Sequence, residues 1–527
     1  MKRLIDRIRS LYAPFAIGLL LLTAAFRADA QLYCNNPVAP CNPDDPQSVC
    51  YRPASPSPRC EPKECGKCTK SPCYVGSGVY STEATDLEIR TVGFPISVSR
   101  LYESSRAVDG EMGVGWVTGL SARIYLTMVL KDTLAEGDNE AYVRLPSGTL
   151  YRFVEDAFGN YVPPPGRFDR LIHNADGTWE LRLQRTRSVY RYAATGELTG
   201  MTDDSGNSLV WSYEKGRLTR IAYNPGGDPK SLGLRYVELT WGSDGRLSDV
   251  TDHTGRSVHY DYDSAGRLAG VTNPLGQSTR YEYAAGRSGP LLRAIDDHWN
   301  RNVTTVTYDA NDRVKTYTDR GETYTYTYAY QGQSRVTAKS DSSGNTRVYT
   351  FTPEGLVTDI QPPGGGASEH VDYDGNGLPV LEIDATGVKT RYEYDARGNF
   401  ATVTRDYQGP TAVEWRFAYH PDFPDEPVSI LPYSPSTGQI SPDWQGVRFE
   451  YHPLGSVSEG LLQRLYAVDA GGATARLVAA FTWDSQGRLH TETDAGGNVR
   501  TETYGELGER TILMPANNDA GTRPVIR

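Results

Sequence analysis

The chain has 527 residues, a formal net charge of −11 and a mean hydropathy of −0.51. Its 53 Gly and 35 Tyr against 5 Met and 12 Phe are typical of turn-rich β structure, because Gly permits positive φ and Tyr favours strands. This composition excludes a polytopic membrane protein, a coiled coil and a helical bundle. The acidic charge argues against a nucleic-acid partner, because it would repel the phosphates.

Residues 1–30 have the pattern of a secretory signal peptide. Basic residues cluster among the first nine positions, residues 16–26 are apolar, and an Ala-x-Ala motif ends at Ala30. The apolar stretch is too short to cross a bilayer comfortably. We expect cleavage before Gln31, export from a bacterium to the medium or the cell surface, and no transmembrane span in the mature chain. An uncleaved membrane anchor is the alternative.

All the cysteines lie in residues 31–73, a segment rich in Pro and poor in apolar residues. In an exported protein this pattern predicts disulfides that replace a core the segment cannot build. The pairing is open, and one thiol is left over because the total of seven is odd. A zinc knuckle or a redox pair at the CxxC motif is the alternative. The disulfide candidates are Cys34, Cys41, Cys50, Cys60, Cys65, Cys68 and Cys73.

Residues 74–185 do not repeat, but their pattern is that of a β module. Alternating apolar and polar residues predict strands at 96–100 and 122–126. The Pro-rich stretch at 163–166 breaks the pattern. No long helix is predicted after residue 30, so we expect an all-β protein.

From about residue 190 the sequence repeats itself. Each unit begins with an aromatic residue, often followed by Asp, and continues through a turn with Gly-Arg-Leu and a second turn, often Asp-x-x-Gly. Most spacings between the leading aromatics are 21 or 22 residues, and a fixed period signals a repeat architecture. The leading aromatics are expected at Tyr192, Tyr213, Trp241, Tyr262, Tyr283, Tyr308, Tyr330, Phe351, Tyr373, Tyr394, Tyr419, Tyr451, Trp483 and Tyr504.

Each unit has room for two short strands and two turns, and Asp, Asn and Gly suit those turns. Residues 322–328 alternate strictly between Thr and Tyr after the first Glu, which predicts a strand with one aromatic face. We expect stacked antiparallel hairpins over 186–510, in a twisted sheet that curls into a spiral or partial shell, and a tail at 511–527. The predicted structural anchors are Tyr192, Tyr213, Trp241, Tyr262, Tyr308, Tyr373, Tyr394 and Trp483, with turn glycines Gly216, Gly245, Gly266 and Gly487.

These units resemble the YD repeats of bacterial Rhs proteins, which have distant relatives in teneurins and insecticidal toxin complexes. The resemblance covers roughly residues 74–510. It implies a β shell that winds around a cavity and encloses a variable C-terminal polypeptide, often a toxin. Other family members act in contact inhibition, adhesion or carbohydrate binding. The stretches similar to the N-terminal module that precedes Rhs repeats are 84–87, 93–96, 100–105, 113–116 and 143–151.

The chain departs from the family pattern near its end. Complete Rhs proteins carry a long core with a DPxGL-like motif, at which an aspartyl-protease-like site releases the cargo. We find no such segment before Arg527. A fragment, a truncated reading frame and a relative without cargo are the alternatives.

The sequence carries no strong catalytic or metal-binding motif. We find no nucleophile elbow, P-loop or dinucleotide motif. Carboxylate pairs such as Asp203 and Asp204 are more typical of turns than of a glycosidase, and the turn residues lack the ligand density of a calcium loop. We expect no enzyme activity and no cofactor. The histidines are scattered, at His173, His253, His259, His298, His370, His420, His452 and His490.

Together these patterns favour an exported, non-catalytic scaffold that builds a β shell around a polypeptide cargo or toxin. One alternative is a cell-surface protein that binds carbohydrate or mediates adhesion, which exposed rows of Tyr and Trp would favour over buried ones. Another is the N-terminal fragment of a polymorphic toxin whose enzyme lies beyond Arg527.

Overall fold

The computed structural model describes residues 73–91, 94–106, 109–127, 140–146, 150–163, 168–184, 186–203, 206–224, 235–287, 289–456, 458–472, 474–484, 487–504, 510–513 and 525–526. The predicted signal peptide and every cysteine except Cys73 lie outside these ranges. The described chain consists of strands joined by turns, with short 3-10 helices at η2 (Gly119–Ser121) and η4 (Pro363–Gly365). The expected all-β class is confirmed. No helix in the described part is long and apolar enough to cross a membrane.

The first part of the described chain, up to Ala122, is here called the module and forms a small antiparallel sheet with strand order β1-β2-β3-β6 and a separate β4-β5 ribbon. Leu87, Ile89, Ile96 and Val98 are buried in this sheet, as the alternation at 96–100 predicts. Its strands are β1 (Cys73–Tyr74), β2 (Val79–Ile89), β3 (Ile96–Glu103), β4 (Asp109–Gly110), β5 (Gly113–Val114) and β6 (Trp116–Thr118).

All later strands form one antiparallel meander, here called the wall, in which each strand pairs with the next along the chain. The same rule holds to the last described strand, so the pairings leave the sheet with two ends, β7 and β41. The wall begins at residue 124, well before the sequence repeat becomes visible.

The first part of the wall runs from β7 to β27. Its strands are β7 (Ile124–Thr127), β8 (Glu140–Arg144), β9 (Leu150–Glu155), β10 (Tyr161–Val162), β11 (Arg170–His173), β12 (Trp179–Arg182), β13 (Val189–Tyr192), β14 (Leu198–Thr202), β15 (Ser208–Glu214), β16 (Arg217–Asn224), β17 (Tyr236–Trp241), β18 (Leu247–Asp252), β19 (Ser257–Tyr262), β20 (Leu268–Thr272), β21 (Ser278–Ala285), β22 (Pro290–Asp296), β23 (Asn302–Tyr308), β24 (Val314–Asp319), β25 (Glu322–Gln331), β26 (Ser334–Ser340) and β27 (Thr346–Phe351).

The second part runs from β28 to β41. Its strands are β28 (Val357–Gln361), β29 (Glu369–Tyr373), β30 (Pro379–Ile383), β31 (Lys389–Tyr394), β32 (Phe400–Arg405), β33 (Val413–Tyr419), β34 (Pro427–Tyr433), β35 (Gly446–Tyr451), β36 (Leu462–Val468), β37 (Ala475–Trp483), β38 (Leu489–Asp494), β39 (Val499–Tyr504), β40 (Arg510–Leu513) and β41 (Val525–Ile526).

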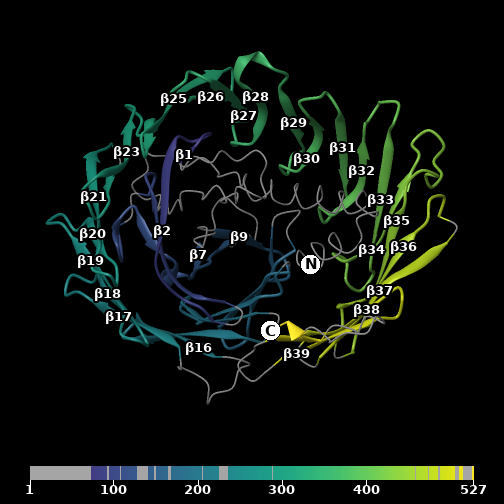
Figure 1. The fold of residues 1–527 in the computed structure, drawn as a ribbon, viewed down its shortest axis with the longest axis horizontal. Coiled ribbons are helices and arrows are strands. Elements are labelled where there is room, and N and C mark those ends of the chain that lie inside the picture. Colours follow the sequence, from purple (N-terminus) through teal and green to yellow (C-terminus); the bar gives the residue numbers. More distant parts are fainter. Residues whose placement is uncertain are drawn as a thin grey trace.

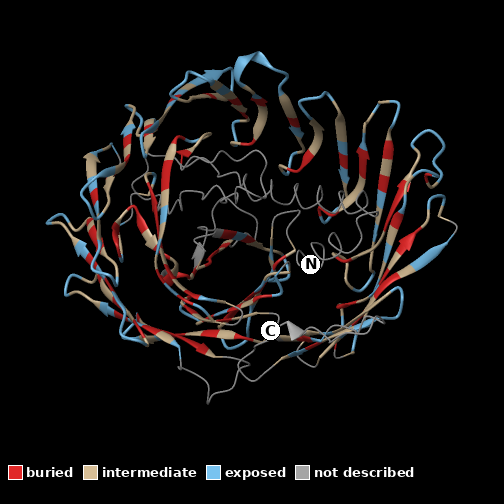
Figure 2. Ribbon diagram, in the orientation of Figure 1, coloured by how far each residue is buried: buried red, intermediate tan, exposed pale blue. Residues whose placement is uncertain are grey.

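The wall curls around the module. Figure 1 shows the strands from β16 to β39 following one another around a ring, with β1, β2, β7 and β9 inside it. Buried residues follow the strands, and exposed residues gather at the hairpin tips (Figure 2). The expected spiral or partial shell is therefore the observed architecture, and its inner face is the surface that the module covers.

The hairpin turns close on themselves through the Asp of the motif. Asp263 Oδ1 accepts hydrogen bonds from the amides of Ala265 and Arg267 at 2.9 and 3.0 Å, and Arg267 Nε donates to Asp263 Oδ2 at 2.7 Å. Gly266 sits between them at φ 73°, and a Cβ there would lie 2.4 Å from the Arg246 guanidinium. The left-handed conformation favours glycine at this position.

The same closure recurs around the wall, with either Arg or Asn four residues after the Asp. Either side chain donates to the second carboxylate oxygen, so the turn needs no partner from another unit. The Arg pairs are Asp252 with Arg256, Asp297 with Arg301, Asp309 with Arg313 and Asp484 with Arg488. The Asn pairs are Asp203 with Asn207, Asp341 with Asn345, Asp395 with Asn399 and Asp494 with Asn498.

The turn carboxylates make part of the stability depend on pH. Burial alone would raise the pKa of Asp252, but hydrogen bonds from Thr254 and Arg256 outweigh it and lower the pKa to about 2. The unfolded carboxyl, with a pKa of about 3.9, takes up its proton first as the pH falls. The contribution of Asp252 is therefore present above pH ~4 and is lost as the pH falls towards 2.

We predict that Asp252→Asn lowers the thermal unfolding midpoint at pH 5 and that the gap to the wild type closes towards pH 2. Asn keeps the first acceptor, as Asn273 does in its own turn. Unfolding followed by circular dichroism at several pH values measures the gap. An exposed turn substitution, Glu354→Gln, is the control. A gap for Asp252→Asn that stays constant over this range contradicts the prediction.

Candidate functional site: the inner face of the wall

The bulged hairpins of the wall end in a pair that the next strand does not reach. Trp241 lies opposite Leu247, for example, while β18 pairs with β19 only from Asp249 onward. We call the aromatic the anchor and the residue opposite it the facing residue. Because the ladder to the next strand begins two residues later, the facing residue has no strand partner for its backbone groups on that side.

The anchor of the next unit supplies the missing donor for the facing carbonyl. Tyr308 Oη donates to the carbonyl oxygen of Leu292 at 2.7 Å. The same bond joins Tyr213 to Leu198, Trp241 to Leu218, Tyr262 to Leu247, Tyr283 to Leu268, Tyr328 to Val314, Tyr373 to Val357, Tyr394 to Pro379, Tyr419 to Phe400, Tyr451 to Pro427, Trp483 to Leu462 and Tyr504 to Leu489, at 2.7–3.0 Å.

Three expected leading aromatics differ from this rule. Tyr192 is 1% exposed at the start of the row, and its hydroxyl has no hydrogen-bond partner within the described chain. Phe351 keeps the ring and lacks the hydroxyl. The prediction of Tyr330 as a leading aromatic is wrong, because β25 and β26 pair without a bulge and extend past the neighbouring hairpin. Tyr328 takes the anchor position, and Tyr330 is 69% exposed.

The Arg of the turn connects one unit to the next anchor. Arg267, which bonds its own Asp, places its Cζ 5.2 Å from the ring centroid of Tyr283. Such contacts add to packing because the guanidinium is drawn to the ring face. The same arrangement joins Arg217 to Trp241, Arg246 to Tyr262, Arg313 to Tyr328 and Arg488 to Tyr504. The predicted turn glycines Gly216, Gly245, Gly266 and Gly487 have φ of 77°, 86°, 73° and 76°.

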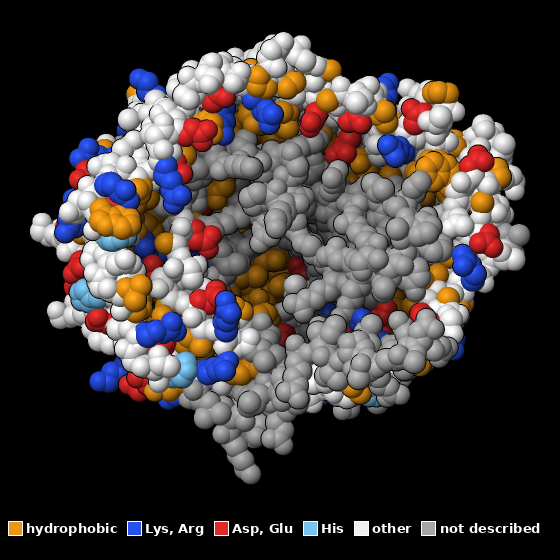
Figure 3. Space-filling model, viewed as in Figure 1, with side chains coloured by type: hydrophobic (Ala, Val, Ile, Leu, Met, Phe, Trp, Pro, Cys, Tyr) orange, Lys and Arg blue, Asp and Glu red, His pale blue; other side chains and the backbone are white. Residues whose placement is uncertain are grey.

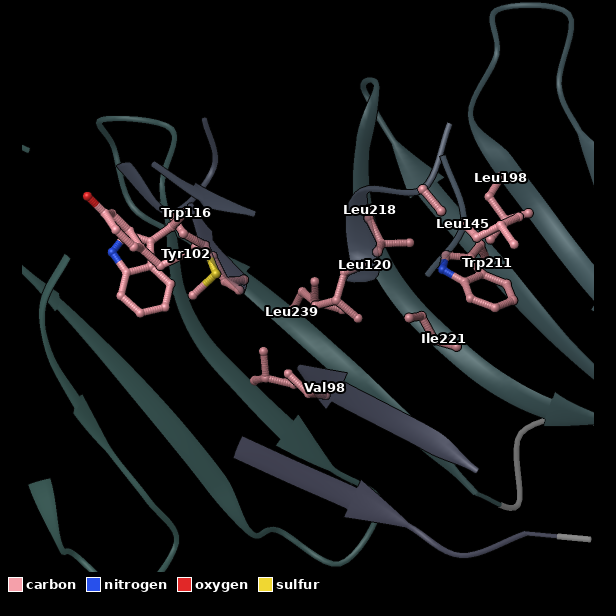
Figure 4. Close-up of a cluster of buried hydrophobic side chains, with 14 of the residues drawn as sticks. Val98, Tyr102, Trp116, Leu120, Leu145, Leu198, Trp211, Leu218, Ile221 and Leu239 are labelled. Carbon is pink, nitrogen blue, oxygen red and sulfur yellow. The ribbon is translucent and has the colours of Figure 1, made fainter. Parts of the chain in front are cut away.

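The module packs against the inner face of the first part of the wall. Figure 4 shows Val98 and Leu120 of the module beside Leu218 and Leu239 of the wall. Trp116 lies 5.0 Å from the ring of Tyr281 and donates to Tyr283 Oη at 2.8 Å. One hydrophobic core therefore contains both sheets.

A buried ion pair lies inside this core. The Arg100 side chain is 3% exposed, and its Nε lies 2.8 Å from Asp86 Oδ2. Both partners belong to the module, and both are also bonded by the wall. Arg100 Nη1 donates to Tyr281 Oη at 2.5 Å, and Tyr260 Oη donates to Asp86 at 3.0 Å. The two charges compensate each other within the module, and docking adds hydrogen bonds from the wall to both of them.

The module also accepts hydrogen bonds from facing amides of the wall. The amide of Leu198 donates to the carbonyl of Ala122 at 3.2 Å, and that of Leu247 donates to the carbonyl of Glu111 at 3.0 Å. The Val314 amide bonds the carbonyl of Gly78 at 2.8 Å, and the Leu292 amide bonds Tyr102 Oη at 2.9 Å. At these four positions the anchor bonds the carbonyl of the facing residue, and the module bonds its amide. The amide is therefore the docking point of the module.

The second part of the wall has its own smaller cores. Tyr392, Val403, Trp415 and Ile430 form one, and a second lies around Leu465 and Phe481. Within the described ranges, the last hydrophobic contact of the module is that of Val75 with the cluster of Tyr349, Phe351 and Ile360. Among the described residues, the hydrophobic clusters of β31 to β38 contain none from the module.

The start of the wall meets its second part at one point. Gln184, in the turn after β12, lies close to the buried carboxyl of Glu426, and so does Tyr451. Burial raises the pKa of Glu426, although the positive charge of Arg187 and the proximity of Gln184 act in the opposite direction. This contact joins residues about 240 positions apart in the chain and holds the beginning of the spiral against the later wall.

Two of the scattered histidines lie between pairs of carboxylates. His259 lies between Asp249 and Asp261, with Nδ1 2.7 Å from Asp249 Oδ1, and His370 has the equivalent place between Asp359 and Asp372. Residues of the wall alternate between its two faces, so these pairs lie opposite buried Tyr260 and Val371, on the outer face.

Cys73 Sγ lies 4.0 Å from Tyr328 Oη, and burial raises the pKa of its thiol to about 12. The other predicted disulfide residues lie outside the described chain. Lys and Arg are interspersed with Asp and Glu around the rim seen in Figure 3, so this view shows no patch of one sign.

Family models and sequence relatives match parts of the chain. The RHS Repeat family model matches residues 243–276, 262–288 and 373–420, and a domain of unknown function, DUF6531, matches 70–153. The chain is 28% identical over 135 residues to tRNA nuclease WapA of Bacillus subtilis (strain 168) and equally to tRNA(Glu)-specific nuclease WapA of Bacillus subtilis subsp. natto. These matches cover 25% of this chain and 5% of each relative.

Among solved structures, a Photorhabdus luminescens Tc holotoxin pore matches with a TM-score of 0.41 at 11% identity, covering 85% of this chain and 25% of that one. The TcdB2-TccC3-Cdc42 structure matches with a TM-score of 0.34 at 12% identity, covering 81% and 27%. The chain therefore spans about a quarter of the length of these structures.

We predict that Tyr308→Phe lowers the free energy of unfolding by about 1–3 kcal/mol, because the Leu292 carbonyl loses its only donor of this kind. Urea unfolding measures the change. Tyr330→Phe removes an exposed hydroxyl from the same sheet and is the control, with no expected change. Equal stability of both variants would show that the anchor bond contributes nothing.

A second variant tests the docking of the module. Arg100→Met leaves the Asp86 carboxylate buried without its cation and should destabilise the protein by about 3–5 kcal/mol. The double variant Arg100→Met, Asp86→Leu removes both charges and should recover most of this loss. Urea unfolding of the single and double variants measures the difference. A double variant as unstable as the single one contradicts the account of the ion pair.

Proposed function

Since the chain carries RHS repeats on a wall that curls around its own N-terminal module, we propose that it is a non-catalytic scaffold that encloses a polypeptide cargo. The observation that carries this proposal is the inward direction of the anchors. Anchors such as Tyr213, Tyr262 and Tyr308 pack against the core that the wall shares with the module, so the wall holds chain against its inner face. An inner face lined in this way suits a polypeptide better than a small molecule.

A toxin is the class of cargo that we propose. The RHS repeats and the tRNA nuclease among the sequence relatives support this choice. The match covers 5% of that nuclease, so its activity is not transferred to this chain. In this proposal any enzyme belongs to the cargo, and the wall itself provides containment.

Adhesion through carbohydrate is the competing function. It needs rows of exposed rings, whereas anchors such as Tyr262 and Trp483 are partly buried and packed in the cores of the wall. Trp299 and Tyr330 are exposed at separate hairpins and form no row. We therefore place enclosure ahead of adhesion.

Export completes the proposal. The signal-peptide pattern of residues 1–30 supports a protein secreted or displayed at the cell surface, and the cysteines of 31–73 support disulfides formed after export. The N-terminal fragment of a longer toxin remains compatible with the proposal, because the wall would contain the same inner face in either case.

The proposal predicts protection of an unfolded chain. A Gly-Ser-rich tail with one site for a sequence-specific protease, fused after Arg527, should be cleaved at least tenfold more slowly than the same tail fused to an unrelated folded protein. Such tails are flexible coils and are cleaved readily in free solution. Gel analysis of cleavage against time measures the ratio. Equal rates on both carriers contradict enclosure.

A further inference from the structure

The facing amides define a donor row that continues beyond the module. In the first part of the wall the module uses four of these donors, those of Leu198, Leu247, Leu292 and Val314. Three of the four acceptors are backbone carbonyls. The wall thus holds its own N-terminal chain largely through main-chain atoms, which every polypeptide has.

The same position recurs in the second part of the wall with the same register. Phe400 faces Tyr394, Leu462 faces Tyr451 and Leu489 faces Trp483. In each case the ladder to the next strand begins two residues later, as it does for the donors that the module uses. The carbonyls of these residues are already bonded by the next anchors, which leaves their amides as the groups equivalent to the docking points.

Two positions of the row have no donor. Pro379 faces Tyr373 and Pro427 faces Tyr419, and proline has no amide hydrogen. Both prolines sit in intact hairpins and still accept the anchor bond through their carbonyls. Proline is therefore compatible with the facing position, and the row can lose a donor without losing the wall.

We propose that the inner face of β29 to β39 binds an extended polypeptide through its backbone carbonyls, on the amides of Phe400, Leu462 and Leu489. This inference rests on the proposed function and names how the cargo is recognised. Folded proteins already pair their carbonyls internally, so such a row selects an unfolded chain whatever its sequence. Consecutive units are two strands apart, about 10 Å, so an extended chain meets one position about every three residues. The position between Phe400 and Leu462 is that of Pro427, which has no donor.

Proline substitutions test the donor row in the full chain with the Gly-Ser tail described above. That tail offers carbonyls and almost no side chains. The variant Leu462→Pro, Leu489→Pro removes two donors, and Leu462→Val, Leu489→Val is the matched control that keeps the amides and trims the side chains. The reverse variant Pro379→Leu, Pro427→Leu adds two donors. Circular dichroism and the thermal midpoint verify that each wall is folded.

We expect the proline variant to increase the cleavage rate of the tail at least tenfold over the valine control, because each hydrogen bond contributes about fivefold. The leucine variant should slow cleavage further. Equal protection in the folded proline, valine and wild-type proteins would overturn the donor row and leave enclosure intact. A wild type that does not protect the tail at all refutes the proposed function itself. If the proline variant does not fold, the leucine variant is sufficient as a test. A cleavage rate in the leucine variant equal to that of the wild type would then overturn the donor row.

Discussion

The whole wall depends on one constraint, which is the need to pair the backbone groups of the facing residue. A hairpin that curls away from its neighbour leaves a carbonyl and an amide without ladder partners at its end. Buried groups of this kind cost free energy unless they are bonded. The anchor hydroxyl or indole satisfies the carbonyl, and in the first part of the wall the module satisfies the amide at four positions. Sequence motif, curvature and docking are consequences of this pairing.

The motif follows from that constraint residue by residue. The Tyr hydroxyl donates to a carbonyl of the preceding unit, and Asp and Gly form the turn. Arg bonds the Asp carboxylate and packs on the ring of the next anchor, and Leu pairs with the anchor across the hairpin. Tyr262, Asp263, Gly266, Arg267 and Leu268 show each step in one unit. Since the anchor of each unit is hydrogen-bonded to the preceding unit, each unit stabilises its neighbour along the chain, as expected for a repeat array.

The sequence period was enough to predict antiparallel hairpins, their turns and the curled sheet, because these depend on local residues and on alternation. It could not show that the wall begins at Ile124, where no repeat is visible, or that Tyr328 replaces Tyr330. Both depend on the register of pairing. The docking of Arg100 and Asp86 against Tyr281 and Tyr260 joins residues more than 170 positions apart, and no local pattern encodes such a contact.

The inner face joins these observations to function. A wall that recognised its partner through side chains would need a matching sequence in each cargo. Main-chain donors along the wall remove that need, and the module shows that the wall can hold chain in this way. Pro379 and Pro427 show that the two roles are separable, because their carbonyls accept the anchor bond while proline has no amide hydrogen to donate. The stability of the wall and its capacity to hold a partner therefore reside in different atoms of the same residue, the carbonyl and the amide, and can vary independently.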